Sequence, residues 1–276
     1  MSIITATCTE MENNDDIDVA YIVVPTGLHA RYAITAAFAG KHVWCEKPMA
    51  LTVEECQSII DAADKNGVHL SIGYRMQHEP NTKTIMRYAQ EETYGAVTGV
   101  KTGAGYDGSH PEGNWRRDAE LGGGALYDMG VYPINAARYS TQMEPIRARG
   151  VQKSDRYEMY DEVDETTTFE LEVRWRDGTG RNQFGKSMNY LDVTCTDGWY
   201  NLRPFQSYSG VQGETSDGKK LPPDPNHQQA RQMDNEALAI IEGRDPIVPA
   251  SEGIKDIRTV QAIMESSRHN RRWVEL

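Results

Sequence analysis

The chain has 276 residues, a formal net charge of −12 and a mean hydropathy of −0.64, which allows one large domain or two modest ones. The acidic surface argues against nucleic acid and anionic membranes as partners, and no stretch approaches the roughly 20 apolar residues that a bilayer span needs. Residues 1–14 lack the basic start and apolar core of a signal peptide, so we expect a cytoplasmic protein. The spacing of Cys8, Cys45, Cys56 and Cys195 indicates neither a disulfide framework nor a zinc site, and we expect no metal.

Residues 17–75 follow a β-α-β-α-β pattern. The β-branched run Asp18–Val24 predicts a buried strand that ends at Pro25. The alanine-rich run Leu28–Ala39 predicts a helix, and His42–Cys45 predicts a second strand. This order is typical of a parallel sheet with helical crossovers.

The next helix should begin at Thr52, because Glu55 stands three residues later in capping-box position, and it should end at Gly67. His69–Ile72 predicts a third strand. In parallel sheets ligands lie at the carboxyl ends of the strands. Three short loops follow those ends here: Pro25–His29, Glu46–Pro48 and Gly73–Arg75.

The pattern changes after residue 75. We predict a helix over Pro80–Ala89, a strand over Ala96–Tyr106, and a helix over Ala125–Tyr139 that follows Gly122–Gly124. Alternating strands then dominate from Ile146 to Pro204. A long series of strands after a βα region indicates a second domain of the α+β class.

Within the strand-rich stretch, Asp177–Gly180 predicts a turn between strands over Thr166–Trp175 and Arg181–Tyr190. Residues 209–227 are rich in glycine, proline and polar side chains and predict a loop. The chain should close with two helices, at about Gln228–Ile241 and Glu252–Arg268.

A glycine-rich phosphate loop is not evident in this chain. A dinucleotide-binding sheet normally opens with a strand and GxGxxG, and the residues before Asp18 do not supply this pattern. The literal match Gly103–Gly108 follows a predicted strand, but Ser109–Gly113 after it cannot start a regular helix. We therefore expect the chain to begin partway through a nucleotide-binding domain.

The tripeptide Glu46–Lys47–Pro48 stands just after a predicted strand. A partly desolvated lysine at that place can act as an acid or a base toward a hydroxyl group. The tripeptide alone is a weak signal, since a lysine in an ordinary surface turn would give the same pattern.

Asp128 and Tyr132 are four residues apart, so in an α-helix they share one face. A tyrosine hydroxyl and a carboxylate that face a lysine can relay a proton in alcohol oxidation. The first amides of the helix, after Gly122–Gly124, can face an anionic or polar ligand. The alternative is an ordinary helix with Tyr132 in the core, Asp128 as a solvated charge and a flexible glycine loop before it.

Two further features have functional and structural interpretations. Trp115 and Arg116 can stack on and hydrogen-bond to a ring, or can form an exposed cation–π pair. His29 follows the end of the first strand, where a lone histidine is more often structural.

The motifs occur in a characteristic order, and together they resemble the Gfo/Idh/MocA family of oxidoreductases. Tyr132, in the place of the family's histidine, and Tyr74–Pro80 are similar to the branch of glucose–fructose oxidoreductase and the aldose dehydrogenases. The resemblance runs from about residue 10 to the C-terminus. The motifs that carry it are Pro25–His29, Ala39–Ala50, Gly73–Arg75, Trp115–Arg116, Gly122–Gly124 and Asp128-x-Gly-x-Tyr132.

The resemblance implies an enzyme that uses NAD or NADP and moves a hydride from a CH–OH group of a sugar or polyol, with glucose or xylose as the expected aldose. It implies that Lys47, Asp128 and Tyr132 act on the substrate hydroxyl, and that a cis peptide precedes Pro48. The cofactor would be lined by Pro25, Thr26, His29, Glu46, Lys47, Pro48, Arg75, Trp115 and Arg116.

The implied fold is α/β, with two domains. Residues 1–75 would form the C-terminal part of a dinucleotide-binding Rossmann domain with a partial parallel sheet. Residues 76–276 would form an α+β domain for substrate binding and oligomerisation, with an open, mostly antiparallel sheet and a last helix able to pack back on the first domain. We expect a homo-oligomer, a dimer or tetramer, through the open sheet.

The family's glycine-rich N-terminal part, with the residue that chooses between NAD and NADP, is missing from this sequence. A truncated, non-catalytic member that binds a sugar or a protein partner without a dinucleotide therefore stays open. A third alternative is a structural subunit that associates through the C-terminal sheet over Thr166–Tyr190.

Overall fold

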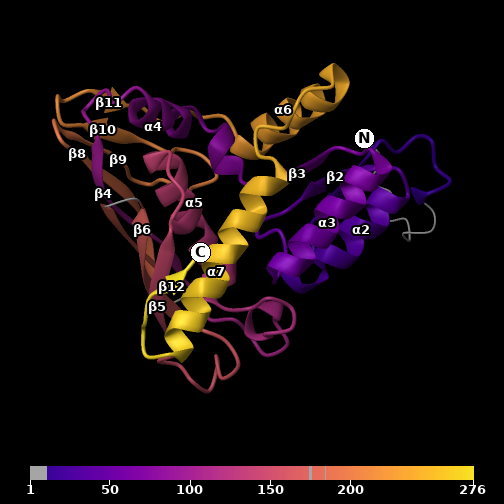
Figure 1. The fold of residues 1–276 in the computed structure, drawn as a ribbon, viewed down its shortest axis with the longest axis horizontal. Helices are drawn as coiled ribbons and strands as arrows, with labels where there is room; N and C mark the ends of the chain where they lie inside the picture. The colour runs from indigo at the N-terminus through magenta and orange to yellow at the C-terminus, as the bar shows by residue number, and fades with distance from the viewer. Residues whose placement is uncertain (1–10, 174–175, 184) are drawn as a thin grey trace. The chain divides into compact units, whose positions relative to one another are not determined.

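The computed structural model of the chain describes residues 11–173, 176–183 and 185–276 (Figure 1). These residues form two compact units. The first contains the chain up to Tyr74 together with Asp234–Ile257, and the second contains Arg75–Met233 together with Arg258–Leu276. The assignment of a cofactor domain to 1–75 and a substrate domain to 76–276 stays a prediction.

The first unit is built on a parallel sheet. Among the described residues its order is β1 (Val19–Ile22), β2 (His42–Cys45), β3 (Leu70–Ile72), with Val19 paired to His42 and Val43 to Leu70. Val43 and Cys45 of the central strand are fully buried. The predicted parallel sheet is confirmed, and the carboxyl ends of its strands lie at one edge.

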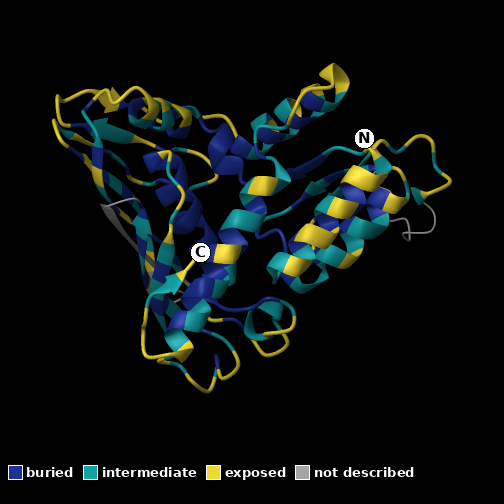
Figure 2. Ribbon diagram, in the orientation of Figure 1, coloured by how far each residue is buried: buried dark blue, intermediate teal, exposed yellow. Residues whose placement is uncertain are grey.

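Two helices of the first unit, α2 (His29–Phe38) and α3 (Val53–Asn66), lie side by side (Figure 1). The predicted capping box starts α3: Thr52 Oγ1 accepts from the Glu55 N–H at 3.1 Å, and Glu55 Oε2 accepts from the Thr52 N–H at 3.2 Å. The helix ends at Gly67, whose φ of 63° is left-handed. Figure 2 shows buried and exposed residues alternating along α3, as expected for a helix with one face on a core.

The second unit is built on a long open sheet, in which neighbouring strands are antiparallel except for the parallel pair β4 and β7. Its order, among the residues that the structure describes, is β11 (Lys220–Leu221), β10 (Gly213–Thr215), β9 (Trp199–Leu202), β8 (Gly185–Cys195), β4 (Val97–Asp107), β7 (Arg176–Gln183), β6 (Thr166–Val173), β5 (Arg147–Lys153), β12 (Val274–Glu275). The predicted open, mostly antiparallel sheet after a parallel one is confirmed.

The remaining helices agree with the predicted ones to within a few residues, apart from one segment. They are α4 (Pro80–Gln90), α5 (Val131–Thr141), α6 (Gln228–Glu242) and α7 (Ala250–Arg268). Every residue of α5, which packs on β4 and β7, is buried (Figure 2). Across the described residues, the helices are too short or too polar for any of them to traverse a bilayer. The 3₁₀ helices are η1 (Thr26–Leu28), η2 (Arg75–His78) and η3 (Trp115–Arg117).

The expected regular helix over Ala125–Tyr139 is wrong at its start, because Leu126–Gly130 form a π-helix, η4, ahead of α5. Pro133 has no N–H, so it cannot make the backbone hydrogen bond that an α-helix needs in this turn. Wide π turns are a known response to such interruptions and are frequent at functional sites.

The sheet corrects one prediction for a glycine-rich segment and agrees with another. Asp177–Gly180 is not a turn: it lies within β7, where Gly178 pairs with Leu171 and Gly180 with Phe169. Glycine keeps both backbone hydrogen-bonding groups, so nearby strands can hold it in a ladder despite its turn propensity. Gly103 and Gly105 lie in β4 between β7 and β8, which agrees with the expectation that this GxGxxG match is not a phosphate loop.

Candidate active site

The loop after β2 carries Glu46, Lys47 and Pro48, and the Lys47–Pro48 peptide is cis, as the resemblance implied. The Glu46 carboxylate accepts hydrogen bonds from the Tyr21 hydroxyl of β1 and, at 3.2 Å, from the Lys47 N–H. A Cβ on Gly73, just after β3, would lie 3.0 Å from Glu46 Cδ. A larger residue there would require Glu46 to shift by a few tenths of an ångström, so glycine suits the close approach of the ends of β2 and β3.

His29 connects the end of β1 to the loop that follows β2. Its ring is buried, with Nδ1 2.8 Å from the Pro48 carbonyl oxygen and Nε2 2.8 Å from the Val24 carbonyl oxygen. Burial lowers the pKa of His29 below its ordinary value, although the two carbonyls oppose the shift. The geometry thus favours the structural interpretation, in which His29 fixes the Lys47–Pro48 turn to the end of β1. Its predicted contact with a cofactor stays a prediction.

The end of β1 offers apolar surface. Val23 is 61% exposed and Val24 36% exposed, whereas Thr26 is buried in η1 and Pro25 is half-buried. The turn between β1 and α2 is a 3₁₀ helix without a glycine-rich run, so in the described part of the chain this turn presents no pyrophosphate cradle.

In the second unit, Asp128 lies in η4 and is buried. Its Oδ2 accepts a hydrogen bond from Arg116 Nε at 2.8 Å and from the Tyr106 hydroxyl at 3.3 Å. Burial acts to lower the pKa of Arg116, but the Asp128 carboxylate outweighs it and raises that pKa. The prediction of a solvated Asp128 is thus wrong, because the ion pair and the hydroxyl replace its water.

Trp115 and Arg116 form the cation–π pair that the sequence suggested, with the guanidinium carbon 4.4 Å from the ring centroid. Both residues are half-exposed in η3. The additional contact of Arg116 with Asp128, twelve residues along the chain, is the functional feature that sequence reasoning missed.

Tyr132 is buried at the start of α5, and Arg75 covers it. Arg75 Nη2 donates to the Tyr132 hydroxyl at 3.4 Å, and its guanidinium carbon lies 5.3 Å from the Tyr132 ring centroid and 4.2 Å from that of Tyr208. The same guanidinium donates to the Gln206 carbonyl at 2.5 Å and the Ser207 carbonyl at 3.0 Å. Arg75 therefore fastens Tyr132 to the loop after β9, and its predicted contact with a cofactor stays a prediction.

The glycines before η4 make a tight turn rather than a flexible loop. Gly124 has a φ of 95°, and a Cβ there would lie 2.4 Å from Asp164 Oδ1. Asp164 accepts from the Leu126 N–H at 3.0 Å through Oδ2, and its carbonyl accepts from the Ala125 N–H at 2.9 Å. The expectation that these two amides face a ligand is therefore wrong. The anion at the helix start is the Asp164 carboxylate, which comes from a segment 38 residues away from Leu126.

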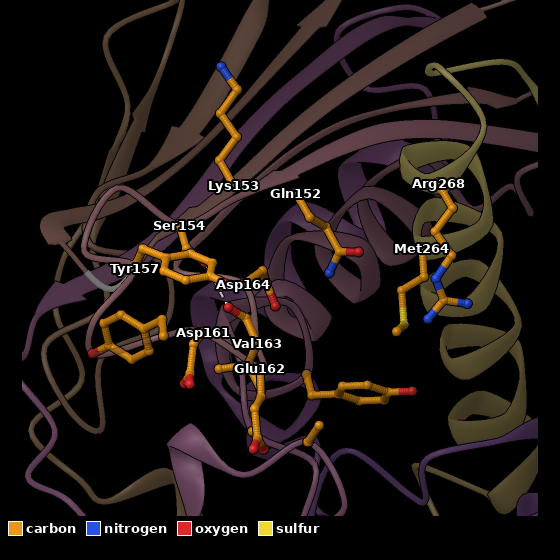
Figure 3. A pocket seen from close by; sticks show the side chains of 14 residues that line it. Gln152, Lys153, Ser154, Tyr157, Asp161, Glu162, Val163, Asp164, Met264 and Arg268 are labelled. Carbon is orange, nitrogen blue, oxygen red and sulfur yellow. Dashed lines mark hydrogen bonds between the residues drawn. The ribbon is translucent and has the colours of Figure 1, made fainter.

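A cavity of about 400 Å³ lies next to Asp164 in the second unit (Figure 3). Gln152, Asp161, Glu162 and Arg268 contribute polar groups to its wall, while Lys153 points away from the other side chains in this view. Lys47, Asp128 and Tyr132 are not among its lining residues. The residues that we consider for catalysis therefore do not line this cavity.

Comparisons with known proteins agree with this architecture. Residues 4–74 match the model of an oxidoreductase family with an NAD-binding Rossmann fold, 82–201 match the Gfo/Idh/MocA C-terminal domain, and 209–276 match an oxidoreductase C-terminal α/β domain. The crystal structure of aldose–aldose oxidoreductase from Caulobacter crescentus, complexed with glycerol, is 34% identical with a TM-score of 0.91, and the match covers 97% of this chain and 82% of that one.

The chain belongs to the Gfo/Idh/MocA oxidoreductase family. This member is also 29% identical over 266 residues to D-xylose 1-dehydrogenase (NADP+) from Haloarcula marismortui, which covers 92% of this chain and 73% of the relative. Levoglucosan dehydrogenase, solved in complex with NADH and levoglucosan, shares the Gfo/Idh/MocA fold at 21% identity with a TM-score of 0.87, over 98% of this chain and 83% of that one. The family resemblance inferred from the ordered motifs is confirmed.

Proposed function

We propose that this Gfo/Idh/MocA member is an NAD(P)-dependent dehydrogenase that oxidises a CH–OH group of a sugar or polyol, most readily an aldose such as glucose or xylose. The observation that carries the proposal is the pair of fixed polar groups in one short segment: Asp128 held by Arg116, and Tyr132 held by Arg75. The similarity to a xylose dehydrogenase and to an aldose–aldose oxidoreductase supports the aldose as substrate.

In the proposed reaction, Tyr132 acts as its phenolate: it accepts the proton of the substrate hydroxyl as the carbon loses its hydride, and it ends as the neutral phenol. The positive charge of Lys47 favours the loss of that proton and orients the oxygen. Asp128 accepts hydrogen bonds from other sugar hydroxyls, and Arg116 keeps its carboxylate in place. The substrate is thus bound and deprotonated by side chains that the fold has already oriented.

The hydride acceptor is a nicotinamide, which supplies the redox chemistry when it is bound. We propose that it is held by the strand-end residues Pro25, Thr26, His29, Glu46 and Pro48, with Arg75, Trp115 and Arg116 completing its surroundings. The Glu46 carboxylate, fixed by the Tyr21 hydroxyl, can accept hydrogen bonds from a ribose. NAD and NADP are both candidates, because the residue that discriminates them is not among the motifs of this chain.

A titration with NADH and NADPH, followed by nicotinamide fluorescence, tests the cofactor part of the proposal. We expect saturable binding of at least one nucleotide, and reduction of NAD+ or NADP+ when glucose or xylose is added. A folded protein that binds neither nucleotide, or one that binds but reduces neither with any aldose or polyol, would refute the dehydrogenase function.

One observation favours a second candidate, a member that binds a sugar or a protein partner without a dinucleotide. The β1–α2 turn, made by the 3₁₀ helix Thr26–Leu28, lacks the glycine-rich run of a phosphate loop. This alternative predicts sugar binding in the absence of nucleotide, with an affinity that added NADH or NADPH leaves unchanged. Calorimetric titration of xylose with and without NADH separates the two candidates.

We also propose that the open sheet of the second unit joins subunits into a dimer or a tetramer. Support comes from its extended order of strands, from β11 to β12, which leaves a broad face. Light scattering at several protein concentrations should give a mass of two or four chains, and a single-chain mass would count against this association.

A further inference from the structure

A hydrogen-bonded array extends from Asp128 deeper into the second unit. The Tyr106 hydroxyl lies 3.3 Å from Asp128 Oδ2 and 2.8 Å from His110 Nε2. On the other side of the imidazole, His110 Nδ1 lies 2.9 Å from the Tyr160 hydroxyl, which in turn lies 3.3 Å from the Gly108 carbonyl oxygen. Asp128 is thus connected to two tyrosines and a histidine that no sequence motif indicated.

Three members of the array are buried: Asp128 is 7% exposed, His110 8% and Tyr160 1%. Tyr106, which links Asp128 to His110, is half-buried. Both tyrosine rings pack edge-on against the imidazole: the His110 ring centroid lies 5.7 Å from that of Tyr106 and 6.0 Å from that of Tyr160. Burial raises the pKa of both tyrosines and lowers that of His110, so at neutral pH the array consists of two neutral hydroxyls and a neutral imidazole. The charged groups that face His110 are Asp128, Arg116, Arg117 and Arg156.

A neutral imidazole donates through only one nitrogen, so the array has two self-consistent arrangements. In the first, His110 Nε2–H donates to the Tyr106 oxygen, Tyr106 donates to Asp128, and Tyr160 donates to His110 Nδ1. In the second, Tyr106 donates to His110 Nε2, His110 Nδ1–H donates to the Tyr160 oxygen, and Tyr160 donates to the Gly108 carbonyl. The first arrangement directs the Tyr106 hydroxyl to the buried carboxylate, which also accepts from Arg116, whereas the second directs it to His110.

A hydrogen bond to a buried carboxylate is about twice as strong as one to a neutral carbonyl. The first arrangement exchanges the Gly108 carbonyl for Asp128 as the final acceptor, so it is favoured while Asp128 is ionised. We infer that Tyr106 and His110 are positioning residues that fix Asp128 for the sugar, with His110 held in the Nε2–H tautomer. The expected effect on turnover rests on the proposed function, whereas the expected tautomer of His110 does not.

The tautomer can be read directly from the ring ¹⁵N shifts of histidine-labelled protein, with His110→Gln to assign the signal among the seven histidines. We expect Nε2–H at pH 8 in the wild type. In Asp128→Leu, which removes the acceptor, we expect the proton on Nδ1, because the Tyr106 hydroxyl turns to Nε2. A wild type with the proton on Nδ1, or the same tautomer in both proteins, would overturn the inference whether or not the chain is a dehydrogenase.

Kinetics test the positioning role. Tyr106→Phe should raise KM for the aldose roughly 10-fold or more, which is the scale of one lost hydrogen bond to a charged group, with a smaller effect on kcat. His110→Gln, whose amide can donate to Tyr106, should retain most of the wild-type KM, whereas His110→Leu should resemble Tyr106→Phe. Tyr157→Phe is a matched control, since Tyr157 is 69% exposed.

The kinetic outcomes separate the two claims. An unchanged KM in Tyr106→Phe, in a protein that turns over aldoses normally, refutes the positioning role alone. A wild type without dehydrogenase activity refutes the proposed function, and the tautomer experiment then still decides whether the array is set as inferred.

Discussion

Arg75 Nη2 donates to the Tyr132 hydroxyl at 3.4 Å and to the Gln206 carbonyl oxygen. Its Nη1 donates to the Ser207 carbonyl oxygen. One buried side chain therefore orients the proposed catalytic hydroxyl and anchors the loop that follows β9. The planar fork of arginine suits this work, because it presents several donors in fixed directions. Tyr132 is thus oriented by a residue that lies 57 positions earlier in the sequence.

Arg75→Lys should therefore be a harmful substitution although it keeps the charge. Lysine is a single point donor and can satisfy only part of the set of acceptors around Arg75. We expect a loss of about 2 kcal/mol in the free energy of unfolding, from unsatisfied buried carbonyls, together with a fall in kcat. Urea denaturation and steady-state kinetics measure the two effects. Wild-type values for both would show that Arg75 does not organise Tyr132 and the loop.

The ion pair between Arg116 and Asp128 predicts a second substitution effect. Arg116→Met keeps most of the side-chain volume over Trp115 but leaves the buried Asp128 without its closest donor. Because Arg116 is 30% exposed and water can partly replace it, we expect a loss of about 1–2 kcal/mol of substrate binding, or roughly a 10-fold rise in KM for the sugar. The matched control is Arg117→Met, on the same 3₁₀ helix, and equal effects of the two variants would argue against the specific role of Arg116.

Asp164 should make stability fall as the pH rises. Burial raises the pKa of its carboxyl from 3.8 to about 6, so the native state holds this proton more tightly than the unfolded chain does. The stabilising contribution is complete below about pH 4 and is lost as the pH rises through 6. The difference corresponds to at most about 3 kcal/mol.

The test compares the wild type with Asp164→Asn, an isosteric change whose amide oxygen can still accept from Leu126 and Thr167. From pH 4.5 to 7, the free energy of unfolding of the wild type should fall relative to that of the variant. Parallel curves over this range would mean that Asp164 does not titrate as its buried site requires.

Local signals were enough to predict the elements of the first unit. The capping pair Thr52 and Glu55 lies within one helical turn, and Gly67 ends the same helix through its own backbone conformation. In the second unit, the glycines at 177–180 were misassigned because the pairing of β7 with β6 overrides the turn propensity of a single segment.

The candidate site could be predicted only where its residues form contiguous motifs. Lys47, Asp128 and Tyr132 stand in recognisable patterns, whereas their supports come from distant segments: Asp164 caps Leu126 from 38 residues away, and Tyr160 reaches His110 across 50. No local periodicity encodes such pairs, since only the folding of the whole second unit brings β4, η4 and the segment before β6 together. The wide turn at η4 also escaped prediction, although Pro133 marks where a regular helix must change.

The most direct test of the account is the turnover of Lys47→Ala and Tyr132→Phe with the best aldose and its preferred nucleotide, beside Lys153→Ala and Tyr157→Phe as exposed controls. We predict that kcat/KM falls about 10²- to 10⁴-fold in the first two variants, as expected for the loss of an acid–base group, while the controls stay at the wild-type value. Near-normal turnover in both Lys47→Ala and Tyr132→Phe would contradict the assignment of these residues to catalysis.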